Sequence, residues 1–218
     1  MPTFPGSPKL LKGGIILIDP TTGTMLPNGI ISLQYNPDTI SRTLQVQGAG
    51  GEGGDRSEAL RIKGPPVETI KLEAEIDATD QLEAADGTAV EVGLHPQLAR
   101  LELLLYPRSG QLQENNHLVA SGKLEILPME APLTLFIWSR QRTMPVRITE
   151  FSVTEEAFDA ALNPIRAKIS LGLRVLSVDD LGFSHKGGTL FMNYLANKEQ
   201  LAGRAPGGTT AATGFSGF

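Results

Sequence analysis

The sequence predicts a mainly β protein of the α+β class, and three observations support this. Residues 165–175 alternate between apolar and polar side chains without a break, which is the period-two pattern of a strand with one buried face. Residues 145–153 form a second strand candidate just before it, so the two predict a long antiparallel hairpin. Residues 95–106 carry leucines at helical spacing, which predicts a helix packed on the sheet.

The predicted hairpin has one face for a core and one for water or a polar partner. On the first strand, Arg147 falls on the polar side, and the alternation then breaks, which predicts a bulge near Glu150. A connection over residues 154–164 ends at Asn-Pro, which stops any helix before the next strand. The polar positions of the second strand include three cations: Arg166, Lys168 and Arg174.

The N-terminal segment predicts an extended arm and three short strands. Residues 1–14 contain prolines at positions that disfavour a helix, so they predict the arm. A strand at residues 15–18 ends in an Asp-Pro turn, and a second turn signal, Pro-Asn-Gly, precedes a strand at residues 30–35. After an Asn-Pro corner, residues 40–47 form the next strand.

A glycine-rich stretch follows at residues 48–54. It fits the dinucleotide-binding pattern G-x-G-x-x-G, but no helix opens after it to face a pyrophosphate, so we predict a flexible loop. Residues 67–76 then alternate as another strand with one wet face. Residues 78–89 are acidic and predict a loop, and residues 108–128 predict a long polar segment with a short strand at residues 118–126.

The C-terminal third predicts one buried strand and one helix around the hairpin. Residues 133–138 are apolar at nearly every position, which predicts burial on both faces or a covering neighbour. After Val178, the run Asp-Asp-Leu-Gly breaks the sheet, and Thr189 caps the last helix. Its apolar side carries Leu190, Phe191, Tyr194, Leu195 and Leu201.

Composition limits the function. The net charge is -5, which argues against a nucleic-acid binder that works through bulk positive charge. The chain contains no cysteine, so it forms neither disulfides nor thiolate metal sites. No window approaches the about 20 apolar residues that span a bilayer, and residues 1–12 lack a signal-peptide core. We therefore expect no direct membrane contact.

Catalytic constellations are not evident. The histidines His95, His117 and His185 show no metal-ligand spacing, and no serine lies in a G-x-S-x-G elbow. Two carboxylates distant in the chain could still form a glycosidase pair, but no residue type argues for one. We expect no enzyme, no cofactor and no metal. The cations of the hairpin have two interpretations: a solvated face paired with Glu68, Glu73 or Glu75, or the lining of a channel or subunit contact.

Several motifs in order resemble one known family. They are the strand ending in Tyr-Asn-Pro at residues 35–37 with Arg42 after it, the run at residues 132–138, Pro-Val-Arg-Ile-Thr at 145–149, and the segments 155–159 and 162–167. Together these are similar to the tube domains of contractile injection systems, the phage-tail-like particles whose inner tube is driven out by a sheath. The resemblance covers about residues 29–178.

The resemblance implies two packed antiparallel sheets that form a barrel-like body with a packed helix and a C-terminal helix. With the arm and a Gly/Thr/Ala-rich C-terminus that predicts disorder, the expected division is an arm (1–14), a tube-like β domain (15–180), a helical extension (181–203) and a disordered tail (204–218). The resemblance also implies a closed six-fold ring lined by polar strand faces. In such domains, the loop after residue 48 contacts a neighbouring subunit, so its charges are interface candidates, with solvated loop charges as the alternative: Asp55, Arg56, Glu58, Arg61 and Lys63.

The function that the resemblance implies is structural. The motifs look closest to the adaptor ring that joins the inner tube to the spike and baseplate proteins, with a main or initiator inner-tube subunit as the alternative. The wall-binding LysM module of longer adaptors is not recognisable here. Such a protein is made in the bacterial cytoplasm and incorporated into the particle, which stays there or is released. A β-barrel module that binds a small molecule or a peptide is the second alternative.

Overall fold

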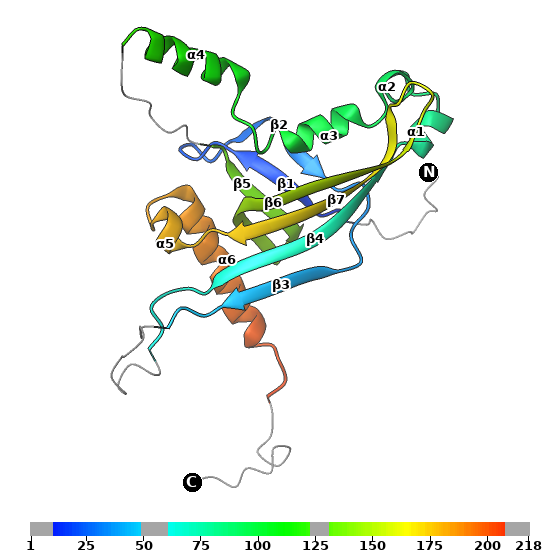
Figure 1. Ribbon diagram of the computed structural model, residues 1–218. Helices are drawn as coiled ribbons and strands as arrows, with labels where there is room; N and C mark the ends of the chain where they lie inside the picture. Colours follow the sequence, from blue (N-terminus) through cyan, green and yellow to red (C-terminus); the bar gives the residue numbers. More distant parts are fainter. Residues whose placement is uncertain (1–10, 49–60, 123–130, 208–218) are drawn as a thin grey trace.

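The computed structural model describes residues 11–48, 61–122 and 131–207 (Figure 1). Its centre is one open sheet of seven antiparallel strands in the order β2-β1-β5-β6-β7-β4-β3. The strands are β1 (Gly14–Ile18), β2 (Met25–Ser32), β3 (Ile40–Gln45), β4 (Val67–Asp77), β5 (Leu133–Ser139), β6 (Arg142–Phe158) and β7 (Pro164–Val175). The α+β class is confirmed.

The expected pair of packed sheets forming a barrel is wrong. β5 pairs with β1 on one side and with β6 on the other, so the two expected sheets are joined into one. The sheet curves enough that Leu33, which follows β2, shares a core cluster with Ile70 of β4. Gln34 fixes this curvature, because its side-chain amide exchanges two hydrogen bonds with the backbone of Asp77, at 2.7 and 3.0 Å.

The β6–β7 hairpin is confirmed and is longer than predicted. Ile148 pairs with Leu173 and Glu150 with Gly172, so one extra residue bulges out of β6 where the sequence pattern breaks. The predicted connection over residues 154–164 is wrong, because β6 continues to Phe158. This outer part of the hairpin extends past the core, so no buried face imposes an alternating pattern on it.

The N-terminal hairpin uses a different turn from one of those predicted. The turn at Asp19 is confirmed, and its carboxylate accepts hydrogen bonds from the backbone N–H groups of Thr21 and Thr22. The Pro-Asn-Gly turn is wrong: these residues lie inside β2, where the register with β1 shifts and Asn28 takes a φ of 57°.

The described ranges contain six helices: α1 (Thr79–Glu83), α2 (Gly87–Val92), α3 (His95–Glu102), α4 (Ser109–Ala120), α5 (Val178–Leu181) and α6 (Lys186–Ala202). The predicted helix at residues 95–106 is confirmed as α3, which buries Leu98 and Leu101 but ends earlier. The prediction of a loop at residues 78–89 is wrong, because α1 and the start of α2 lie there. The predicted strand at residues 118–126 is wrong over residues 118–122, where α4 ends and a turn follows, and residues 123–126 lie outside the described residues.

The N-cap of α6 is His185 and not the predicted Thr189. The His185 imidazole Nδ1 accepts a hydrogen bond from the backbone N–H of Gly187 at 3.0 Å. Gly187 and Gly188 are buried against the end of α5, and a Cβ on Gly188 would lie 1.9 Å from the Gly182 carbonyl oxygen. These glycines resemble a loop in sequence, yet they let the two helices meet. Leu201, predicted on the apolar side, is 41 % exposed.

One face of the sheet forms the core. Alternate residues of β7 from Ala167 to Val175 are buried, together with Leu98 of α3 and with Phe191 and Tyr194 of α6. In Figure 1, α6 lies behind β3 and β4, so the view faces the opposite side of these strands. None of the described helices is long and apolar enough to cross a membrane.

Candidate functional site

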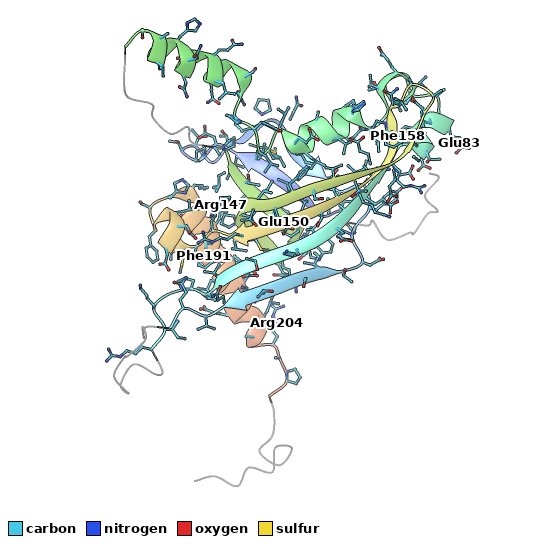
Figure 2. The ribbon with its side chains drawn as sticks, in the orientation of Figure 1. Glu83, Arg147, Glu150, Phe158, Phe191 and Arg204 are labelled. Atoms are coloured by element: carbon cyan, nitrogen blue, oxygen red, sulfur yellow. The ribbon has the colours of Figure 1, made fainter. Side chains whose placement is uncertain are left out.

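The candidate site is the polar face of the sheet, which four predicted site residues share. Residues that face each other across an antiparallel pair lie on the same side of the sheet. The cations of β7 therefore lie on one side with their partners in β4 and β6. Figure 2 labels two of these residues, Arg147 and Glu150, on β6. The charged members are Lys71, Arg147, Arg166, Lys168 and Arg174, with Glu73, Glu75, Asp77, Glu150 and Glu156.

Cross-strand ion pairs cover most of this face. Of the carboxylates predicted as partners, Glu75 pairs with Arg166, whereas Glu73 forms no ion pair among the described residues. Further pairs link β7 to β6 and β4 to β6. The distances are 2.8 Å for Arg166 to Asp77, 3.5 Å for Arg166 to Glu75, 2.9 Å for Lys168 to Glu156, and 2.8 Å for Lys71 to Glu150. Because water screens these exposed pairs, they contribute little to stability.

The pairs keep the face charged. Burial raises the pKa of Asp77, but hydrogen bonds from Thr79 and Arg166 lower it more, so this pKa lies below its usual value. The hydrogen bond to Asp77 raises the pKa of Arg166, and the one to Glu156 raises the pKa of Lys168. The face therefore carries nearly balanced positive and negative charge at neutral pH.

Arg147 differs from the other cations. It lies directly opposite Arg174, and two like charges in that position repel. Arg174 Nη2 contacts Asp180 Oδ1 at 2.7 Å, which offsets its charge. Within the described part of the chain, Arg147 forms no ion pair, so its exposed guanidinium is open to a partner.

The loop candidates lie elsewhere. Arg61 and Lys63 are exposed beside β3 and β4, where the Lys63 N–H donates to the Gln47 carbonyl oxygen at 2.9 Å. The structure therefore does not bring them together with the cations of β7. Asp55, Arg56 and Glu58 lie outside the described residues.

A second charged cluster lies on the core face, where sequence reasoning missed it. Glu68 was expected to pair with the hairpin cations, but its position in β4 matches that of Ile70 and Leu72, so it points into the core and is only 4 % exposed. Its carboxylate meets Arg42 at 2.7 Å, the Tyr194 hydroxyl at 2.9 Å and Lys198 at 2.8 Å. The sequence did signal this cluster, because Glu68 occupies a strand position at which the alternation predicts an apolar, buried residue.

The cluster holds Glu68 ionised. Burial raises the pKa of this carboxyl, but the hydrogen bond and charge of Lys198, with hydrogen bonds from Tyr194 and Arg42, lower it below its usual value. Burial likewise raises the pKa of Tyr194. Lys198 Nζ also lies 4.2 Å from the centre of the Tyr194 ring. The cluster fixes α6 to β3 and β4, and a structural role accounts for it.

A pocket of about 290 Å³ opens between β2, β4 and α3. Its floor includes Leu33, Ala74 and Ile169, and the side chains of Gln81 and Gln97 reach its wall. Ligand pockets usually measure about 300–1,000 Å³, so this one is at the small end. Across the described ranges, no three His, Asp or Glu side chains gather as a metal site would require.

The comparisons with known proteins add the following. No protein-family model and no curated protein sequence matches the chain. One similar solved chain belongs to the virion of a native gene transfer agent particle: it is 9% identical, with a TM-score of 0.27, over 76% of this chain and 91% of that chain. Another belongs to the tail of an empty gene transfer agent particle with C6 symmetry: it is 12% identical, with a TM-score of 0.28, over 75% of this chain and 90% of that chain.

Proposed function

We propose that this chain is a structural subunit of a phage-tail-like contractile particle, and that six copies form the adaptor ring between the inner tube and the spike and baseplate. One observation carries the proposal: the sheet is open at both edges, while one of its faces is polar and free of the core helices. Most of the motifs that resemble tube domains lie on the strands of this sheet, and the Tyr-Asn-Pro motif lies in the connection between β2 and β3.

The open edges suit self-assembly. Within the described residues, β2 and β3 each pair with a strand on one side only. Arg100 donates to the backbone carbonyl oxygens of Asn28 and Ile30 on β2, both at 2.6 Å, so β3 is the edge that leaves its backbone groups free. β3 presents Thr43 and Gln45 as exposed, uncharged side chains. Natural edge strands that stay unpaired usually carry charged side chains, above all lysine, or proline as protection. β3 carries neither lysine nor proline, and its one charge, Arg42, is paired with Glu68. Contact between β3 and the next copy would therefore extend the sheet around a ring.

The polar face suits a wet lining. Its ion pairs give little stability, so the fold does not need them, and a lining with balanced charge attracts no strong counterion layer. Arg147 remains as a cation for a neighbour or for the contents of the channel. A main or initiator tube subunit would use the same geometry and is the alternative. The small pocket gives less support to a ligand-binding module.

Native mass spectrometry of the purified chain tests the ring. The wild type should show a six-fold species that grows with concentration, and Thr43→Lys should abolish it, because a lysine on the edge blocks pairing with another copy. Gln113→Lys adds the same charge on exposed α4 and should assemble normally. If the Thr43 variant assembles as the wild type does, β3 is not the ring interface. A wild type that stays monomeric contradicts the ring.

A further inference from the structure

We propose that the tip of the β6–β7 hairpin docks on the β3 end of a second copy. The tip is formed by Val90 of α2 with Phe158 and Leu162 of the hairpin. The receiving surface, which we call the socket, is formed by Leu44, Val46, Arg61, Ile62 and Lys63. This proposal rests on the proposed self-assembly. It identifies the tip of a neighbouring copy as the surface that Arg61 and Lys63 contact.

Leu162 is the first observation. It is 76 % exposed and has a φ of 66°, in the left-handed region that glycine or asparagine occupies at little cost. The chain therefore accepts backbone strain at a leucine whose side chain is not buried in the fold. Backbone strain that no contact within the fold requires is typical of functional positions. A partner that covers this leucine would explain the choice of residue.

The tip is rigid, so it can present this side chain. The Asp159 carboxylate accepts hydrogen bonds from the backbone N–H groups of Ala161 and Asn163, both at 2.8 Å, and from the Asn163 amide at 2.8 Å. The Asn163 amide also donates to the Glu91 carbonyl oxygen at 3.1 Å, which ties the hairpin to α2. A preorganised apolar surface loses less entropy when it binds.

The helical segment beside the tip is acidic. Residues 79–99 contain Asp80, Glu83, Asp86 and Glu91 but no lysine or arginine. Figure 2 shows Glu83 at the same end of the molecule as Phe158. An apolar surface beside an acidic segment fits a partner with an apolar patch and basic side chains.

The socket has this chemistry. Val46 is 68 % exposed and Ile62 is 70 % exposed, and Leu44 beside them is also exposed. The basic residues Arg61 and Lys63 flank Ile62 in sequence and are exposed as well. Gly48 and Ile62 form a β-bridge, which holds the two chain segments of the socket together.

The tip and the socket cannot meet within one chain. They lie at opposite ends of β4, whose 11 residues span roughly 33 Å at about 3.3 Å per residue. A contact between them must therefore join two copies in a head-to-tail manner. Contacts of this type close into a ring when the rotation between copies permits it.

Leu162→Asn tests the tip without harming the fold. Asparagine tolerates a positive φ, so the melting temperature of the variant should stay the same or rise. If Leu162 had only a structural role, its replacement would lower the melting temperature. Loss of the buried leucine contact should raise the dissociation constant between copies by about 10- to 100-fold in sedimentation equilibrium. Leu112→Asn on α4 removes another exposed leucine and should leave association unchanged.

A charge exchange tests the pairing of the two surfaces. Glu83→Lys with Glu91→Lys, and separately Arg61→Glu with Lys63→Glu, should each abolish association, and an equal mixture of the two variants should restore it. Association of Leu162→Asn at wild-type strength, or a mixture that does not recover, overturns the tip contact. If Thr43→Lys still blocks the ring in that case, the proposed function stands without this inference. A monomeric wild type would overturn both.

Discussion

Glu68→Gln is the most informative single change, because it removes one buried charge from a cluster that holds the last helix on the sheet. Breaking a buried ion pair costs about 3–5 kcal/mol. Arg42 and Lys198 are partly exposed, so water can solvate them once the carboxylate is gone. We therefore expect the free energy of unfolding to fall by about 2–3 kcal/mol, somewhat less than for a fully buried pair. Urea denaturation measures this change.

Glu73→Gln is the matched control. Glu73 lies on the same strand but is exposed on the polar face, so its loss should change the free energy of unfolding by less than about 0.5 kcal/mol. Hydrogen exchange should also show faster opening of α6 in Glu68→Gln and not in Glu73→Gln. Equal midpoints for the two variants, or unchanged exchange in α6, would refute the role assigned to the buried cluster.

Three further predictions concern packing and pH. Gly188→Ala should lower the free energy of unfolding by about 1–3 kcal/mol in urea titrations, because its Cβ would overlap a backbone carbonyl; Gly110→Ala, which meets nothing, should not. Calorimetry should show a loss of about 2–5 kcal/mol for Leu171→Ala but at most about 1 kcal/mol for Lys71→Ala, and equal losses would contradict the assignment of the two faces. The folded-state pKa of Glu68 lies below its unfolded value of 4.5, so its stabilisation is full above pH 4.5 and is lost as pH falls through the folded-state pKa. The melting temperature of Glu68→Gln should therefore depend less on acid pH than that of the wild type, and parallel curves would oppose this.

The hairpin could be predicted from sequence because its core half is governed by burial on one face. β7 buries every second residue, and the bulge in β6 appears in the sequence as a break in that alternation. The outer part of β6 was missed because both of its faces are exposed, so pairing with β7 alone maintains it. Likewise, α4 buries no residue and carries no apolar stripe that would predict a helix.

The arrangement of strands could not be predicted because it depends on contacts between distant residues. β5 joins the N-terminal hairpin to β6, and a local pattern cannot specify this pairing. The site was predicted in part: the cations of β7 and Arg147 share one face, but Glu68 was assigned to the wrong side. Its three partners come from β3 and α6, which lie 26 to 130 residues away in the chain.

Quantitative mass spectrometry of native particles tests the central claim most directly. Large particles would be pelleted from lysate, imaged by negative stain and analysed for this chain and for the main tube subunit. We predict that the chain sediments with sheathed tubes at far lower abundance than the tube subunit, as an adaptor ring requires. Comparable abundance would identify a tube subunit in place of an adaptor. Recovery only as a small soluble species would contradict the structural role and favour the binding module.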